Sequence, residues 1–217
     1  MTTWLTRIAP DVRHQLAAAD LTDAVGMHRT VMRLFPANLG DQARQAAGVL
    51  FRLDEDPQGT SILIQSGHEP DPARLPNGYG TIAVRSLDPL MDALRPGLPV
   101  RYRLTANSSR KLGRNTQAGK PLSIVPLHGV EAEQWWARQA EQSGLELRIV
   151  TAMSLDTANG IRTDRTTKNH QRQHHARTRF DGTAVITDPD TLRERITTGI
   201  GRAKSYGCGL LTLAPAR

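Results

Sequence analysis

The order of strands and helices expected in the second half of the chain restricts its fold more than any other feature. Apolar, β-branched runs predict strands, and longer stretches with start and stop signals predict helices. The strands are expected at residues 100–104, 145–150, 184–186 and 210–213, and the helices at residues 130–143 and 189–198. The resulting order of strand, helix, strand, strand, helix, strand is that of a ferredoxin-like unit. The sequence therefore predicts an α+β fold.

The first half of the chain repeats part of this order. A strand at residues 4–9 precedes a helix at residues 21–35, for which Asp20 is the candidate N-cap and Pro36 the stop. Further strands are expected at residues 49–53, 61–65 and 81–84, with a polar turn at residues 54–59.

The segment Arg95-Pro96-Gly97 between the two halves has the composition of a boundary. We therefore predict tandem ferredoxin-like (RRM-like) βαββαβ domains over residues 1–94 and 95–217.

The chain is strongly basic, with 28 Lys and Arg residues against 21 Asp and Glu residues, and its sequence pI is about 10.3. A protein with this charge is expected to bind polyanions such as nucleic acid. Most of the cations are arginines, which a GC-rich genome would also explain. The argument therefore depends on where the cations lie.

Two stretches concentrate the positive charge. Residues 101–120 hold six cations and no acid, and residues 160–180 hold six cations and one acid, with three histidines between them. A solvated surface loop is the alternative, but two such stretches favour contact with nucleic acid. The candidate binding residues in them are Arg110, Lys111, Arg162, Arg165, Lys168 and Arg172.

The cysteine content and the lack of long apolar segments indicate where in the cell the protein is expected. The single cysteine, Cys208, cannot form an intramolecular disulfide, which fits a cytoplasmic protein. The sequence contains no signal-peptide pattern and no run of about 18 apolar residues, so neither secretion nor a membrane span is expected.

A glycine-rich segment precedes the last predicted strand. Its glycines and cations are Gly199, Gly201, Arg202, Lys204, Gly207 and Gly209. Glycine lets backbone N–H groups approach a ligand closely and adopts positive φ, so this composition favours phosphate binding. The alternative is a helix C-cap that leads into a core strand, but this requires only one or two glycines.

His28 is the candidate catalytic residue with the most informative position. The apolar stripe of the predicted helix consists of Leu21, Val25, His28, Met32 and Phe35. Spacing alone favours a buried, structural histidine. At the edge of an apolar face, however, the imidazole is partly desolvated and neutral near pH 7, as a general base must be.

Three segments resemble the CasE family, the repeat-processing endoribonucleases of type I-E CRISPR systems. They are the glycine-rich tail 199–217, the segment Met27–Pro36 and the segment Leu98–Asn107, in the order that the family has them. The resemblance implies that His28 is the catalytic histidine. It also implies that the 2′-hydroxyl of the RNA attacks the adjacent phosphate, without a metal ion or other cofactor.

The resemblance also implies the substrate and the partners. The family binds the hairpin of a CRISPR repeat, cuts at the 3′ base of its stem, and stays with the 5′-side product as a subunit of the surveillance complex Cascade. Residues 160–180 correspond to the basic hairpin that enters the major groove of the stem. Arg29 and Arg33, beside His28, join the candidate RNA-binding residues.

The sequence departs from the family pattern at one position. It agrees with the metal-independent cleavage that the resemblance implies. Val25 stands where family members often carry a tyrosine, so a second catalytic side chain either comes from elsewhere or is absent. The candidates for that role are Arg29, Arg33, Lys204 and Tyr206. No CxxC pair is present, and His170 and His174 have no carboxylate or thiolate neighbour that would complete a metal site.

Two other functions remain as alternatives. The chain would be a non-catalytic RNA-hairpin-binding subunit of the same fold if His28 were only a core residue. A basic double-stranded DNA-binding protein would also fit the composition, but the sequence shows no helix-turn-helix or zinc-finger signature.

Overall fold

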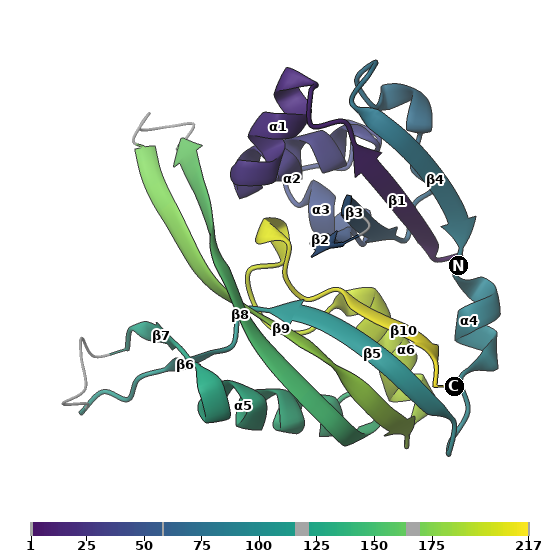
Figure 1. Ribbon diagram of the computed structural model, residues 1–217, viewed down its shortest axis with the longest axis vertical. Helices are drawn as coiled ribbons and strands as arrows, with labels where there is room; N and C mark the ends of the chain where they lie inside the picture. The colour runs from purple at the N-terminus through teal and green to yellow at the C-terminus, as the bar shows by residue number, and fades with distance from the viewer. Residues whose placement is uncertain (1, 58, 116–121, 164–169, 217) are drawn as a thin grey trace.

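A computed structural model describes residues 2–57, 59–115, 122–163 and 170–216 of the chain, with only the backbone described for residues 159–163 and 170–174. Two four-stranded sheets form the framework (Figure 1). The first unit lies above the second in this view, and the ribbon of β8 and β9 extends away from the second sheet.

The first sheet has the strand order β2-β3-β1-β4, and every pair in it is antiparallel. Its strands are β1 (Trp4–Pro10), β2 (Leu50–Asp56), β3 (Gly59–Ser66) and β4 (Gly80–Ser86). The helices of this unit are α1 (Gln15–Thr22), α2 (Ala24–Arg33), the short α3 (Ala43–Ala46) and the 3₁₀ turn η1 (Pro72–Arg74). Only η1 occupies the fully described connection from β3 to β4, where a complete ferredoxin-like unit has its second helix.

The predicted helix at residues 21–35 is two helices in the structure. Asp23 ends α1 and begins α2, and its carboxylate accepts a hydrogen bond from the Val25 N–H at 3.0 Å. The prediction of Asp20 as the N-cap is wrong. Asp20 lies buried inside α1, where it accepts a hydrogen bond from the Tyr79 hydroxyl at 3.0 Å. Both residues are aspartates, so composition could not distinguish the cap from the buried acceptor.

The second sheet repeats the same topology, with the order β10-β5-β9-β8 and antiparallel pairs. Its strands are β5 (Pro99–Ala106), β8 (Leu145–Thr163), β9 (His170–Ile186) and β10 (Leu211–Pro215). The other elements are β6 (Ser109–Lys111), β7 (Ile124–Pro126), α5 (Gly129–Glu141), α6 (Pro189–Thr198) and the 3₁₀ turn η2 (Lys204–Tyr206). Numbered within each unit, both sheets have the strand order 4-1-3-2 of a ferredoxin-like fold, so the predicted α+β class is confirmed.

The β8 and β9 strands are much longer than expected. Strands were predicted only at residues 145–150 and 184–186, whereas the paired strands run to Thr163 and start again at His170. The predicted turn at residues 54–59 is also too long, because β2 continues to Asp56 and β3 begins at Gly59. Polar strand ends of this kind lack the apolar alternation by which strands are predicted.

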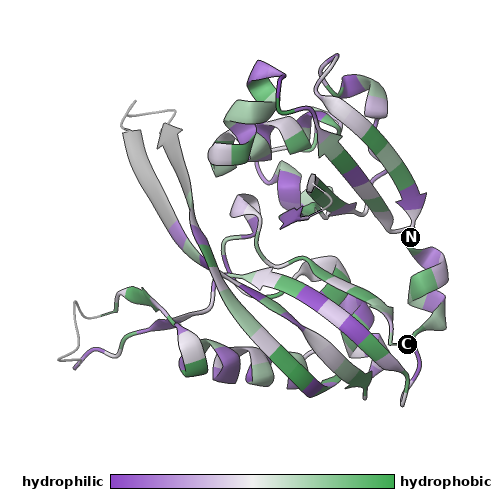
Figure 2. Cartoon of the chain, viewed as in Figure 1, coloured by the Kyte–Doolittle hydropathy of each residue, from purple (hydrophilic) through white to green (hydrophobic). Residues whose placement is uncertain are grey.

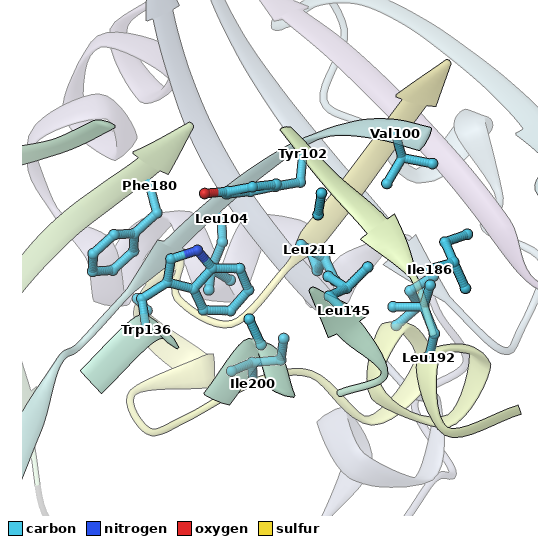
Figure 3. Close-up of a cluster of buried hydrophobic side chains, with 14 of the residues drawn as sticks. Val100, Tyr102, Leu104, Trp136, Leu145, Phe180, Ile186, Leu192, Ile200 and Leu211 are labelled. Atoms are coloured by element: carbon cyan, nitrogen blue, oxygen red, sulfur yellow. The ribbon is translucent and has the colours of Figure 1, made fainter. Parts of the chain in front are cut away.

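Each unit has its own apolar core. In the second unit, α5 and α6 place Trp136, Leu192 and Ile196 against the sheet, and Trp136 lies near Tyr102 and Phe180 at ring-centroid distances of 5.4 and 5.9 Å (Figure 3). In the first unit, Met27 and Val31 of α2 pack against the first sheet. Hydrophobic and hydrophilic residues alternate along β5, as expected for a sheet with one covered face (Figure 2).

The linking helix α4 (Asp88–Ala93) packs with the second unit. Met91 and the following Leu94 belong to its core, and Arg193 of α6 donates hydrogen bonds to both of their carbonyl oxygens at 2.9 Å. The domain boundary between residues 94 and 95 stays a prediction.

A buried arginine connects the two units directly. Arg52 of β2 is 1% exposed and forms a bidentate pair with Asp54, with two N···O distances of 2.8 Å. The same guanidinium donates to the carbonyl oxygens of Arg103 and Leu210 and to the Thr212 hydroxyl, at 3.0, 3.1 and 3.0 Å. Because these acceptors lie on β5 and next to or in β10, Arg52 fixes the first sheet against the second.

Candidate active site

His28 lies on the side of α2 that borders the apolar core. The fully buried residues of the helix are Met27, Thr30 and Val31, so the predicted stripe is displaced by one position and His28 lies at its edge. The imidazole is half-buried against the ring of Phe51, with centroids 6.1 Å apart and an interplanar angle of 30°. Its Nδ1 is buried and has no hydrogen-bond partner among the described residues.

Burial and neighbouring cations keep the imidazole neutral. Burial, followed by the positive charges of Arg44 and Arg29, lowers the pKa of His28 to about 4. At neutral pH the ring therefore has a free lone pair that can accept a proton. A negatively charged ligand beside it would raise this pKa toward the range that suits a general base.

The glycine-rich segment brings η2 to the same place. Ala203 and Gly207 have left-handed backbones, with φ of 57° and 77°, and η2 lies between them. The turn packs against α2 and β2, and a Cβ on Gly207 would lie 3.5 Å from the Phe51 ring. Phe51 therefore lies between the helix that carries His28 and the turn that carries Lys204 and Tyr206.

A group of cations surrounds an open hollow of about 710 Å³ next to this turn. Arg44, Arg202 and Lys204 line it, together with polar residues that include Asn107 and Ser109. Burial and the charges of Arg44 and Arg195 lower the pKa of Lys204. Within the described ranges, none of the three lining cations pairs with a carboxylate.

A second group of cations lines a hollow together with His28. His28, Arg29, Arg33 and Arg74 line a shallow hollow of about 740 Å³. All three arginines are exposed, but Arg74 pairs with Asp71 at 3.2 Å and donates a hydrogen bond to the Phe35 carbonyl at 2.8 Å. The structure thus brings the predicted Arg29 and Arg33 beside His28, in a setting suited to phosphate.

The glycines of the C-terminal segment have structural roles, and Gly199 is the C-cap of α6, as the alternative interpretation expected for one of them. All four have positive φ, from 76° to 91°. The Gly199 and Gly209 N–H groups donate to the carbonyl oxygens of Arg195 and Thr105, at 2.9 and 2.8 Å. A Cβ on Gly201 would lie 3.1 Å from the Trp135 ring. Direct contact of these glycines with RNA stays a prediction.

The remaining candidate residues lie on two extensions of the second unit. Arg110 and Lys111 are exposed on β6. The backbones of Arg162 and Arg172 lie near the ends of β8 and β9, in adjacent register positions. Arg165 and Lys168 fall outside the described residues.

The candidate general acids lie in different surroundings. Arg29 shares a hollow with His28, Lys204 donates a hydrogen bond to the Thr198 carbonyl at 2.7 Å, and the Tyr206 ring lies 4.3 Å from the ring of His175. Val25 is half-buried on α2, one turn before His28.

Sequence reasoning missed Arg44 and Phe51. Arg44 belongs to the one-turn helix α3, which shows no periodic pattern, and Phe51 reads as an ordinary strand residue. Their importance follows only from tertiary packing. A local signal existed in the alternation of Phe51 and Arg52 on β2, because adjacent strand residues point to opposite faces.

Neither a metal cluster nor a membrane helix occurs in the described part of the chain. There, no three His, Cys, Asp or Glu side chains are grouped so that they could hold a metal ion. No helix among those residues is long and apolar enough to cross a membrane. Metal independence stays a prediction.

Comparison with known proteins gives a consistent result over nearly the whole chain. Residues 3–215 match the family model described as CRISPR associated protein. The CRISPR-associated endoribonuclease Cse3 of Thermus thermophilus is 28% identical, over 98% of this chain and 100% of the relative. The CRISPR system Cascade subunit CasE of Escherichia coli is also 28% identical, over 92% of this chain and 96% of the relative.

Solved structures agree with this match. A structure of the endoribonuclease Cse3 bound to a 19-nucleotide RNA superposes with a TM-score of 0.82 at 25% identity, and covers 98% of this chain and 100% of the other. A chain of a CRISPR RNA-guided surveillance complex in a pre-nicking state gives a TM-score of 0.69 at 37% identity, with the same coverage. The predicted resemblance to the CasE family is confirmed.

Proposed function

Since this chain belongs to the CRISPR-associated protein family, we propose that it is a metal-independent endoribonuclease that processes CRISPR repeat RNA. It binds the hairpin of the repeat and cuts at the 3′ base of the stem. It then retains the 5′-side product as a Cascade subunit in the cytoplasm. The relatives named as the endoribonuclease Cse3 and the Cascade subunit CasE support both parts of this proposal.

The position of His28 is the observation that carries the catalytic part. Its ring is neutral, half-buried and held against Phe51, and Arg44 and Arg29 act on it electrostatically. A neutral imidazole can remove a proton, and the nearby cations attract the phosphate from which charge must be dispersed.

The reaction follows from these groups. His28 takes the proton of the 2′-hydroxyl, and the resulting oxygen attacks the adjacent phosphorus. The bond from phosphorus to the 5′-oxygen breaks, and that oxygen acquires a proton from a general acid or from water. The products are an upstream fragment with a 2′,3′-cyclic phosphate and a downstream fragment with a 5′-hydroxyl. Cations beside His28 stabilise the charge that develops on the phosphoryl oxygens.

The two extensions of the second unit supply the hairpin-binding part. Arg162 and Arg172 lie on the projecting ends of β8 and β9, and Arg110 and Lys111 are exposed on β6. Phosphate contacts position a nucleic acid without reading its bases. These four cations are therefore suited to contact the phosphates of a duplex stem.

A cleavage assay with two substrates tests the proposal. An all-ribose repeat hairpin should be cut in EDTA. A hairpin with one 2′-deoxyribose 5′ of the scissile phosphate should bind with similar affinity and remain intact. Cutting of the deoxy substrate, or loss of cutting in EDTA, would contradict this mechanism. Tight binding without cutting of either hairpin would support the non-catalytic RNA-binding subunit.

A further inference from the structure

The cationic hollow beside η2 lies where the two units meet. Arg44 comes from α3 of the first unit, and Lys204 comes from η2 of the second. Arg202 also lines the hollow, and Arg195 of α6 acts on Lys204 electrostatically. Positive charge from both units is therefore gathered at one place.

These cations are held in place without a counter-ion. An Arg44 Nη1 donates to the Val49 carbonyl at 2.9 Å, and Lys204 Nζ donates to the Thr198 carbonyl at 2.7 Å. Each bond fixes the head group but uses only one donor, whereas a guanidinium has five N–H donors and an ammonium has three. The described residues provide no carboxylate within salt-bridge distance of either group.

Gathering partly buried like charges is unfavourable unless an anion compensates for it. Burial lowers the pKa of Arg44, and burial together with Arg44 and Arg195 lowers that of Lys204. Asn107 and Ser109 line the same hollow, but their side chains donate to the carbonyl oxygens of Ala176 and Asn107. The remaining N–H donors of Arg44 and Lys204 suit the multiple oxygens of a phosphate.

We propose that Arg44 and Lys204 together bind one backbone phosphate of the RNA, across the junction of the two units and within electrostatic range of His28. This inference rests on the proposed function, because it takes RNA as the source of the phosphate. It assigns a role to Arg44, which no sequence motif indicated.

A double-mutant cycle tests whether the two residues share a phosphate. The ligand is the repeat hairpin with 2′-deoxyribose 5′ of the scissile phosphate, so that binding is measured without cleavage. Arg44→Gln and Lys204→Gln should each weaken binding about tenfold or more, as expected for a charged hydrogen bond. The affinity of the double variant should lie within about twofold of the affinity of whichever single variant binds the hairpin less tightly. Arg85→Gln, which removes an exposed charge from β4, is the matched control and should bind like the wild type.

The cycle has a contradicting outcome. If the loss in the double variant equals the product of the two single losses, within about twofold, the residues contact different phosphates and the inference is wrong. Arg44→Lys keeps the charge and guards against a folding defect in Arg44→Gln, and it should retain more affinity than Arg44→Gln. Thermal unfolding of every variant reports the folded fraction.

A second measurement separates this inference from the proposed function. Sulfate, an anion of similar shape to phosphate, should raise the melting temperature of the wild type and of Arg85→Gln more than that of the double variant. An equal rise in all three proteins would count against the site. If the losses in the double-mutant cycle are coupled but the protein never cuts RNA, the phosphate site is supported and the proposed endoribonuclease function is contradicted. If the protein cuts RNA but the two losses are independent, the endoribonuclease function is supported and the phosphate site is contradicted.

Discussion

The rings of His28 and Phe51 lie 6.1 Å apart with an interplanar angle of 30°. This contact joins α2 to β2, and the residue after Phe51 is Arg52, which holds the second unit through three hydrogen bonds. The position of the imidazole therefore depends on the strand that also aligns the two units. Gly207 approaches the same Phe51 ring from the glycine-rich segment.

Arg52→Met should strongly destabilise the protein. It removes the bidentate partner of buried Asp54 and leaves Arg103, 4.0 Å from that carboxylate, as the other cation paired with it. Breaking a buried ion pair from one side typically costs about 3–5 kcal/mol. Urea unfolding measures the loss, and Arg13→Met, which breaks an exposed pair with Asp11, should change the free energy of unfolding little. Equal effects of the two variants would mean that Arg52 does not hold the units together.

Gly201→Ala should lower the melting temperature more than Gly207→Ala or Gly97→Ala. All three positions have φ between 76° and 79°, where an L residue costs about 1–2 kcal/mol. A Cβ on Gly201 would also press on Trp135 at 3.1 Å, whereas Gly97 has open space. If Gly207→Ala instead loses RNA affinity per folded molecule and melts like Gly97→Ala, the glycine-rich backbone contacts RNA directly.

Charge reversal on the β8–β9 ribbon should lower the affinity for the hairpin and make that affinity less dependent on salt concentration. Arg162→Glu combined with Arg172→Glu places two acids on paired strands where the family's basic hairpin is expected. Each lost phosphate contact should reduce the slope of log K against log salt by about 0.7–0.9. Filter binding at several salt concentrations measures the slope, with Arg85→Glu as the control. An unchanged slope would assign the ribbon to another role.

The imidazole of His28 should titrate far below the usual range in the free protein. Its pKa is lowered from 6.5 to about 4, so the unfolded chain binds this proton first as the pH falls. Folding stability that depends on His28 is complete above pH 6.5 and declines as the pH falls toward about 4. NMR titration should show this pKa rising in Arg44→Gln and when the uncleavable hairpin binds, because each change makes the protonated ring less unfavourable. A pKa of 6.5 or higher in the free protein would contradict the burial argument.

Local signals predicted the parts of the fold that have regular periodicity or clear ends. Pro189 after the cap Asp188 marked the start of α6, and the alternation of arginines with apolar or aromatic residues at 100–104 marked β5. The ends of β8 and β9 were missed because their residues are polar and their stability comes from pairing with each other. Propensity cannot register that pairing.

The candidate site was predicted only in part, for a similar reason. The resemblance indicated His28, and composition indicated the cations, but neither could place Arg44 or Phe51 beside the histidine. The place of Phe51 depends on packing between α2, β2 and η2, and Arg44 lies on the separate one-turn helix α3. The glycines suggested contact with phosphate, whereas the structure gives Gly199 and Gly209 hydrogen bonds inside the protein.

Single-turnover cleavage by His28→Ala tests the central claim most directly. The variant should cut the repeat hairpin about 10²–10⁴-fold more slowly than the wild type and bind it with nearly unchanged affinity, because a general base contributes to the rate and one imidazole adds little contact area. His128→Ala, which removes an exposed imidazole at the start of α5, should cut at the wild-type rate. A wild-type rate for His28→Ala would show that His28 is a core residue, and its assignment as the general base would be wrong.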